Sequence, residues 1–375
     1  ITNEHLTPEV REYLKRVNTT YHAYDGVTAF LQQAPQNEHS FLYAFNINYA
    51  FAELISEACI GHWTPEQGLS PITSWRAHKN EAEIAGFRRA MQHDGVALVR
   101  FHRELDEKVA DGSINQETEW SIAERLEEIR AEHPEYRGLS FATIAGYAGN
   151  GAIVHYEATA ENHAQLADKS FLLLDSGAHY VSGTTDITRT IPLGVLSDEE
   201  KKAYTLVLKG MIQLSMAHFP AGTTGLALDF AARQSMWREG YDFGHGTGHG
   251  VGSHLCVHEG PHQIRKDRRA ATEVPFQVGM TVSNEPGIYV ANKFGVRLEN
   301  VLVAQPAQQT PFGNFLKFET LTLCPLDLAP IVVEMLEPSE RQWLNAYHEV
   351  VRAELLPLLS DEKDKEWLIK ATTKL

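Results

Sequence analysis

Hydrophobic residues recur at helical spacing in the middle of the chain. From about Ser74 onward, two segments place their apolar residues on one helical face, which predicts two successive amphipathic helices. The residues that define these faces are Ile84, Phe87, Met91, Leu98, Phe101 and Leu105 in the first segment and Ile122, Leu126 and Ile129 in the second. After Pro338 the chain again reads as helical, with an apolar stripe of Trp343, Leu344, Tyr347 and Val351 that we expect to pack within the chain.

Other segments have the period of β-strands. The segments Phe171–Leu174 and Thr281–Ser283 predict buried strands. Between Phe294 and Leu302, apolar residues alternate with Arg297, Glu299 and Val301, which predicts a half-buried strand.

Two more helices are predicted between these strands. Ser197 and Glu200 form a capping-box pattern that opens a helix running towards Pro220, and a second helix ends near Gly240. This order of elements predicts an α+β domain over residues 74–375, with its helices outside a curved sheet. Residues 1–73, with apolar segments such as Phe41–Phe45, are expected to be the C-terminal part of a preceding smaller α/β domain.

Composition excludes several classes of function. The net charge of -16 over 375 residues opposes binding to nucleic acid, and we interpret the short basic cluster Arg265–Arg269 as a solvated loop. No apolar run is long enough to span a membrane, so a cytoplasmic protein is expected. The cysteines, Cys59, Cys256 and Cys324, are too widely spaced for a thiolate zinc site and predict no disulfide framework.

Five residues are candidate metal ligands because each lies on, or at the end of, a segment that its apolar neighbours would bury. They are Asp175, Asp186, His249, Glu285 and Glu299. Taken singly, each carboxylate is better explained as the partner of an arginine or as the cap of a turn. If the four carboxylates converge, however, their charges repel unless cations lie between them, and two divalent ions would balance the charge. Carboxylates with one imidazole favour an ion such as Mn²⁺.

The segment from Gly244 to Gly252 alternates glycine with other residues, including His245 and His249. This pattern matches neither the dinucleotide-binding fingerprint nor the H-E-x-x-H zinc motif. Alternating glycines let the backbone approach a ligand closely while imidazoles project from it. A flexible loop with incidental histidines is the alternative, which we favour less because His258 and Glu259 follow so soon. Arg297 shares a strand face with Glu299 and is a candidate for orienting that carboxylate, with an ordinary cross-strand ion pair as the alternative.

Five motifs, in this order and spacing, resemble those of the Xaa-Pro aminopeptidases (aminopeptidase P), which belong to the pita-bread metallopeptidases. They are NGAIVHY at 150–156, DSGAHYVSGTTDITRT at 175–190, HGTGHGVGSHLCVHEGP at 245–261, SNEPGIY at 283–289 and GVRLEN at 295–300. The resemblance extends from about Ser74 to the C-terminus. It implies a pita-bread catalytic domain with a curved mixed sheet. The larger members of the family have two further domains before the catalytic one.

The resemblance also implies roles for individual residues. Asp175 would bind one metal ion, His249 and Glu285 the other, and Asp186 and Glu299 would bridge the two. The catalytic residues would be His155, His258 and Glu285, and the substrate would lie against His155, His245 and His258. Tyr289 and Arg297 would support the ligands from behind.

The expected activity is removal of an N-terminal residue from peptides whose second residue is proline, with two divalent ions, Mn²⁺ first and Zn²⁺ or Co²⁺ as alternatives. A homodimer is expected from the resemblance alone. An Xaa-Pro dipeptidase (prolidase) shares the ligands and is the first alternative. A non-catalytic peptide-binding module of the same fold is the alternative from another class.

Overall fold

The computed structural model describes residues 3–33, 48–50, 52–53 and 71–375, and the chain divides into two compact units, Ile1–Ser74 and Trp75–Leu375. In the first unit, Thr7 caps the helix α1 (Pro8–Arg16) by accepting a hydrogen bond from the backbone of Val10, and α2 (Val27–Gln33) follows. The apolar segment Phe41–Phe45 lies outside the described residues. That this unit is the end of a preceding domain stays a prediction.

Both amphipathic helices predicted for the middle of the chain are present in the second unit. They are α5 (Glu81–Asp111) and α6 (Glu119–Ala131), and the apolar residues that predicted them are buried. Asn80 and Glu83 form a capping box at the start of α5, and Gly112 ends this helix with a φ of 80°. The short helix α4 (Pro71–Ala77) precedes α5.

The strands form several small antiparallel sheets. Their orders are β1-β4-β5, β2-β3-β6, β10-β13-β14-β7, β11-β12 and β8-β9. Outside these strands, a parallel bridge joins Lys169 and Val195. The bounds are β1 (Tyr136–Leu139), β2 (Ile144–Tyr147), β3 (Phe171–Ser176), β4 (Ala178–Tyr180), β5 (Gly183–Thr184), β6 (Ile187–Pro192), β7 (His218–Pro220), β8 (Gly248–His249), β9 (Gln263–Ile264), β10 (Thr281–Asn284), β11 (Gly287–Val290), β12 (Phe294–Arg297), β13 (Asn300–Thr310) and β14 (Gly313–Thr320).

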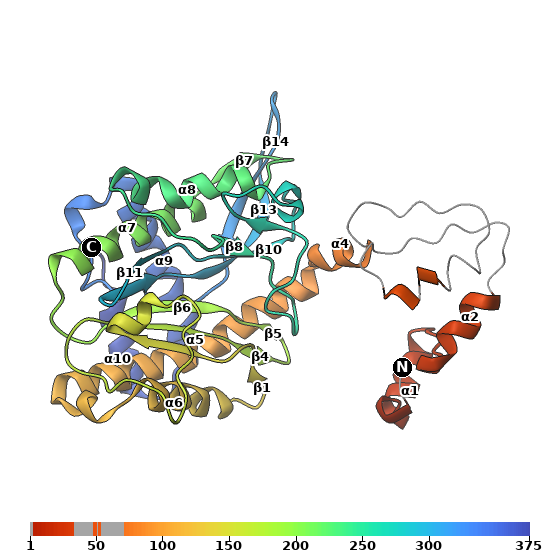
Figure 1. Cartoon of the computed structure of the whole chain (residues 1–375), viewed down its shortest axis with the longest axis horizontal. Helices are drawn as coiled ribbons and strands as arrows, with labels where there is room; N and C mark the ends of the chain where they lie inside the picture. The colour runs from red at the N-terminus through yellow and green to blue at the C-terminus, as the bar shows by residue number, and fades with distance from the viewer. Residues whose placement is uncertain (1–2, 34–47, 51, 54–70) are drawn as a thin grey trace. The chain divides into compact units, whose positions relative to one another are not determined.

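The helices of this unit lie outside the strands (Figure 1). The helices α5 and α6 pack on each other, and α6 packs on β2. The helix α7 (Asp198–Ser215) packs on α8 (Gly225–Arg238) and on the strands β10 to β12. At the C-terminus, α9 (Pro338–Leu355) contacts both α5 and α7, and α10 (Glu362–Ala371) contacts α5. None of the helices in the described part of the chain is long and apolar enough to cross a bilayer.

The elements agree with the sequence pattern except in two places. The capping box of Ser197 and Glu200 is present, but α7 ends at Ser215, and the chain up to Pro220 forms the edge strand β7. The segment predicted as a half-buried strand is buried throughout, and it breaks into β12 and β13 around Glu299. The polar residues Arg297 and Glu299 face an internal pocket instead of bulk solvent, which is why their alternation resembled a half-exposed strand.

Candidate metal centre

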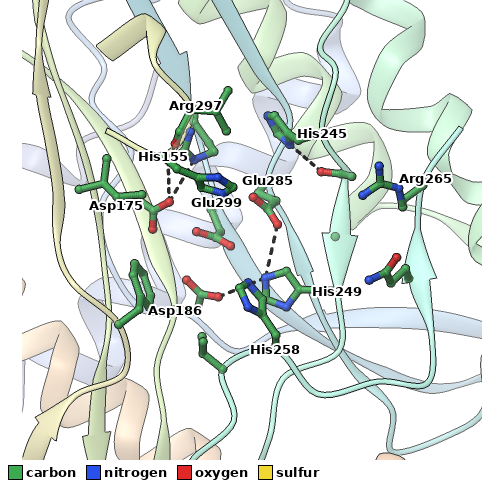
Figure 2. Close-up of a pocket in the computed structure, with 17 residues that line it drawn as sticks. His155, Asp175, Asp186, His245, His249, His258, Arg265, Glu285, Arg297 and Glu299 are labelled. Atoms are coloured by element: carbon green, nitrogen blue, oxygen red, sulfur yellow. Dashed lines mark hydrogen bonds and ion pairs between the residues drawn. The ribbon is translucent and has the colours of Figure 1, made fainter. Parts of the chain in front are cut away.

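A pocket of about 580 Å³ in the second unit contains all but one of the residues singled out in the sequence. Its lining includes His155, Asp175, Asp186, His245, His249, His258, Glu285, Arg297 and Glu299. Figure 2 shows these side chains converging from both sides of the pocket. Tyr289 lies behind this lining, in contact with His245 and Arg297. The convergence of the four carboxylates, which the sequence left as an assumption, is present.

The four carboxylates lie at or near the ends of paired strands. Asp175 lies near the end of β3, and Asp186 directly precedes β6, the strand that pairs with β3. Glu285 follows β10 at once, and Glu299 lies between β12 and β13. Strand pairing fixes these backbone positions, so the carboxylates meet without long flexible loops.

Asp186, His249 and Glu299 each offer one ligand atom, and these atoms all lie within 4.8 Å of one another. The Nε2 atom of His249 is 3.5 Å from Oδ2 of Asp186 and 3.5 Å from Oε1 of Glu285. Its Nδ1 atom lies 3.1 Å from the carbonyl oxygen of Gly250, which can only accept a hydrogen bond. The hydrogen is therefore on Nδ1, and Nε2 presents its lone pair to the carboxylates, as a metal ligand requires.

Within the described residues, Arg297 pairs with Asp175, but this single positive charge does not balance four carboxylates. Burial raises the pKa of Asp186 well above its usual value, and the charges of Asp175 and Glu285 add to this. The pKa of Glu299 is raised by burial and by Asp186, and burial raises that of Glu285 to about 8. Burial lowers the pKa of His249 to about 3, so its ring is neutral. A neutral imidazole among buried carboxylates fits divalent cations, which would relieve the repulsion.

A second hydrogen-bonded chain supports Asp175 from behind. Arg297 donates to Oδ2 of Asp175 from Nη2 at 2.6 Å and to the hydroxyl of Tyr289 from Nη1 at 2.8 Å. The expectation that Arg297 orients Glu299 was wrong, because the carboxylate that it binds is that of Asp175. The Tyr289 hydroxyl lies 2.8 Å from Nε2 of His245, whose Nδ1 lies 2.7 Å from the carbonyl oxygen of Gly246. His245 therefore accepts from Tyr289, and burial lowers the pKa of His245 to about 4. Oδ1 of Asp175 is buried and has no hydrogen-bond partner among the described residues, as expected of an oxygen placed to bind a metal ion.

Ser283 connects two of the candidate ligands. Its hydroxyl accepts a hydrogen bond from the backbone of His249 at 3.0 Å and donates one to Oε1 of Glu285 at 3.1 Å. A Cβ at Gly248 would lie 1.9 Å from the carbonyl oxygen of Ser283. The glycine is therefore required for β8 to approach β10 this closely, and the interpretation of the alternating glycines as a close-approach segment agrees with this geometry.

Glu299 is held by two residues of β6 that the sequence analysis did not single out. Thr188 donates from Oγ1 to Oε2 of Glu299 at 2.8 Å, and the buried Arg189 donates from Nη1 to the backbone carbonyl of Glu299 at 2.7 Å. Arg189 also donates to the carbonyl oxygens of Cys324 and Pro325 and to the hydroxyl of Tyr347. Both residues lie in the motif that contains Asp186, which was the only signal for them.

His155 and His258 come from two loops, each held by a buried carboxylate. Near His155, Asn150 and Tyr156 both donate to the buried Glu119. His258 stacks edge-on against His249, with ring centroids 4.3 Å apart, and burial followed by the charge of His155 lowers its pKa.

The carboxylate that follows His258 is bound by two basic residues. Oε1 of Glu259 accepts a hydrogen bond from Nζ of Lys79 at 2.6 Å, and its other oxygen pairs with Arg76. The backbone of Glu259 donates to the carbonyl of Gly250 at 2.7 Å, which joins this loop to the segment that carries His249. Lys79 lies some 180 residues from Glu259 in the sequence, and nothing in the local pattern indicated the pair.

Comparison with known families and structures identifies the type of protein. The model of metallopeptidase family M24 matches residues 85–306, and the model of that family's C-terminal region matches residues 314–375. A probable Xaa-Pro aminopeptidase P from Laccaria bicolor is 44% identical over 80% of this chain and 47% of its own length. Aminopeptidase P1 from Lotus japonicus is 43% identical over 81% of this chain and 49% of its own. The chain thus spans about half the length of these curated relatives.

Solved structures agree with this assignment. The X-prolyl aminopeptidase from Caenorhabditis elegans, described as a cytosolic enzyme with a di-nuclear active site, matches the whole chain with a TM-score of 0.88 and 32% identity, over 61% of its own length. The prolidase from Pyrococcus furiosus matches 80% of each chain with a TM-score of 0.60 and 23% identity, which shows the shared fold. The predicted pita-bread fold and the resemblance to Xaa-Pro aminopeptidases are confirmed. The chain belongs to metallopeptidase family M24.

Proposed function

We propose that this chain removes the N-terminal residue from peptides with proline at the second position, and that it does so with two divalent metal ions. The observation that carries the proposal is the meeting of four carboxylates and one neutral imidazole in a single pocket, where one buried oxygen of Asp175 has no partner in the described part of the chain. The curated relatives named Xaa-Pro aminopeptidase P support the substrate class.

The ligands divide between two ions. Asp175 would hold one ion, His249 and Glu285 the other, and Asp186 and Glu299 would bridge them. Oxygen-rich ligation with one imidazole suits Mn²⁺ best, with Zn²⁺ or Co²⁺ as alternatives. When bound, such a pair of ions supplies hydroxide at neutral pH by lowering the pKa of water.

The residues of the chain then carry out the remaining steps. Glu285, which lines the pocket among the other carboxylates, would accept a proton and pass it to the prolyl nitrogen as the peptide bond breaks. His258 donates a hydrogen bond to the oxygen that becomes negatively charged in the tetrahedral intermediate. Because the prolyl nitrogen carries no hydrogen, recognition depends on the shape of the ring, which His155 and His245 would contact.

The free amino terminus would lie near Asp175, which restricts the reaction to the end of a peptide. The protein is proposed to be cytoplasmic, in agreement with the description of the Caenorhabditis elegans enzyme, and to form a homodimer by family analogy. The longer relatives support the proposal that residues 1–73 are the end of a preceding smaller domain and residues 74–375 the catalytic domain.

The proposal is tested with two peptides that differ only in having proline or alanine second, using metal-stripped protein with and without added Mn²⁺. Metal-dependent cleavage confined to the proline peptide is expected. Cleavage of both peptides would refute the proline specificity, and cleavage of neither would favour the non-catalytic peptide-binding module. Cleavage of an Xaa-Pro dipeptide but of no longer peptide would identify a prolidase instead.

A further inference from the structure

Within the described residues, one positive charge in the pocket makes no hydrogen bond to a candidate metal ligand and acts on the cluster only through its charge near Glu285. Arg265 follows β9, which pairs with β8 so that Gln263 lies opposite His249. Alternate residues of a strand share a face, and accordingly His249, Gln263 and Arg265 all line the pocket while Ile264 is buried in the core. The basic cluster that contains Arg265 was interpreted as a solvated loop, and for this residue that interpretation was wrong.

The position of the Arg265 guanidinium is restrained on two sides. Its Nε atom donates to Oδ1 of Asp267 at 2.9 Å, and the side chain is only 20% exposed. A Cβ at Gly246 would lie 3.0 Å from Cγ and 3.1 Å from Nη1 of Arg265, so the side chain packs directly on this glycine. Within the described part of the chain, neither Nη1 nor Nη2 donates a hydrogen bond to the protein. A restrained guanidinium with two free nitrogen atoms is suited to bind a carboxylate.

The distance along the strand fits a short peptide. Figure 2 shows Arg265 and Asp175 on opposite sides of the pocket, with His249 and Glu285 between them. Two residues of a strand advance by roughly 7 Å from Gln263, the partner of His249, to Arg265. An extended peptide covers the same length with about two residues. Counted from a cleaved bond beside His249, this length would bring the second residue after the bond to Arg265.

We propose that Arg265 binds the free C-terminal carboxylate of short substrates, so that the chain prefers Xaa-Pro-Xaa tripeptides that end at this point over blocked or longer peptides. This inference rests on the proposed function. It gives a role in substrate binding to the end of the pocket that lies beyond the leaving group. The two Nη atoms would donate charge-assisted hydrogen bonds to the substrate carboxylate and so strengthen substrate binding. They would not contact the peptide bond that is broken. The effect is expected in KM more than in kcat.

The test compares Ala-Pro-Leu as the free acid and as its C-terminal amide, on the Mn²⁺-loaded wild type and on Arg265→Gln. Arg268→Gln is the matched control, because Arg268 is 80% exposed, pairs with Glu273 and lies outside the pocket lining. The wild type and the control should favour the acid about tenfold in kcat/KM through KM, and Arg265→Gln should cleave both peptides about equally. Arg265→Lys should keep part of the preference for the acid, because lysine retains the positive charge but lacks the planar guanidinium that donates two hydrogen bonds to one carboxylate.

Binding of the product Pro-Leu and of its amide, measured by calorimetry, gives a readout that does not depend on turnover. Wild-type protein should bind the acid about tenfold more tightly, and Arg265→Gln should bind the two alike. An acid preference that survives in Arg265→Gln, or that is absent from the wild type, overturns the role of Arg265 while cleavage of the amide still upholds the aminopeptidase activity. Failure to cleave any prolyl peptide would instead refute the proposed function. A wild type that cleaves prolyl peptides but binds Pro-Leu no more tightly than its amide would overturn only the role of Arg265.

Discussion

Arg297 binds one oxygen of Asp175 twice and leaves the other oxygen bare. Its Nη2 and Nε atoms donate to Oδ2 at 2.6 and 3.2 Å, whereas Oδ1 is buried and accepts no hydrogen bond from the described residues. The arginine thus fixes the plane of the carboxylate and directs its free oxygen into the pocket. An oxygen held this way is preorganised for a metal ion.

Replacing Arg297 by Lys should weaken metal binding at Asp175, because lysine has no planar fork with which to hold the carboxylate in one orientation. We expect affinity for Mn²⁺ to fall about 10- to 100-fold, as is usual when the support of a ligand is lost. Calorimetric titration of metal-stripped protein measures this. Tyr289→Phe keeps both bonds between Arg297 and Asp175 and should change affinity less, and an Arg297→Lys protein that binds Mn²⁺ like the wild type would contradict the role given to Arg297.

The metal-free protein should lose stability as pH rises from about 6.5 to 8. Burial raises the pKa of Glu285 to about 8, and the pKa values of Asp186 and Glu299 are raised by burial and by neighbouring carboxylates. A carboxyl group whose pKa is raised by folding stabilises the native state while it is protonated, and this stabilisation is lost as pH rises through the folded pKa. The histidines with lowered pKa values act in the opposite direction, but only below about pH 6.5. Urea denaturation should show a loss on the order of 1–2 kcal/mol across this window.

Two controls separate this effect from general alkaline destabilisation. Asp186→Asn removes one charge of the cluster, so the metal-free variant should lose less stability over the same pH range. Saturating Mn²⁺ should reverse the trend, because the metal binds the ionised carboxylates. A metal-free wild type whose stability is flat from pH 6.5 to 8 would show that the carboxylates are not coupled as the geometry requires.

His258→Ala should reduce turnover without releasing metal. His258 lies against His249 and lines the pocket, but it is not one of the five candidate metal ligands, so its loss is expected to remove only a hydrogen bond that forms as the oxyanion develops. We expect kcat to fall about 10²- to 10³-fold, with metal content by atomic absorption unchanged. Unchanged turnover would eliminate this role, and loss of metal would make His258 a ligand support instead.

Lys79→Met should destabilise the protein because it leaves the buried Glu259 with a half-exposed partner only. The Lys79 side chain is 1% exposed, whereas that of Arg76 is 52% exposed. Breaking a buried pair by removing one partner costs about 3–5 kcal/mol in the free energy of unfolding. Urea denaturation measures this change.

The double variant Lys79→Met with Glu259→Leu should recover part of the loss, since no unpaired charge then remains in the interior. Arg76→Gln is the matched single change at the exposed partner and should cost about 1 kcal/mol or less. Equal stability of Lys79→Met and the wild type would mean that Glu259 is hydrated or protonated in the folded chain.

The sequence predicted those parts of the molecule that depend on local pattern. The periodicity of Ile84 to Leu105 was sufficient for α5, and the apolar runs before Asp175 and Glu285 were sufficient to place both carboxylates at strand ends. The distances between ligands depend on which strands pair, and no local pattern specifies that β3 and β6 lie side by side. The residues behind the site, such as Glu119 and Arg189, were missed for the same reason, because their partners are far away in the sequence.

The local sequence pattern was also misleading for polar residues whose side chains face an internal pocket. Arg297 and Glu299 alternate with apolar neighbours as solvent-facing residues do, but they face the pocket. Arg265 lies in a run of charges whose other arginines, Arg268 and Arg269, are largely exposed. The alternation of polar and apolar residues indicates that a side chain faces away from the apolar core. It does not show whether that side chain faces bulk water or a polar cavity.

The contacts of Arg189 bear on how far the protein can be divided. This arginine holds the backbone of Glu299, within the first region matched by the family models, and the backbone of Cys324 and the hydroxyl of Tyr347, within the second. The gap between the two regions covers the end of β13, the turn and the start of β14, and these two strands are paired along most of their length. The two regions are therefore not separable modules: an engineered enzyme that exchanged only the C-terminal region would also inherit, or lose, the anchoring of a candidate metal ligand.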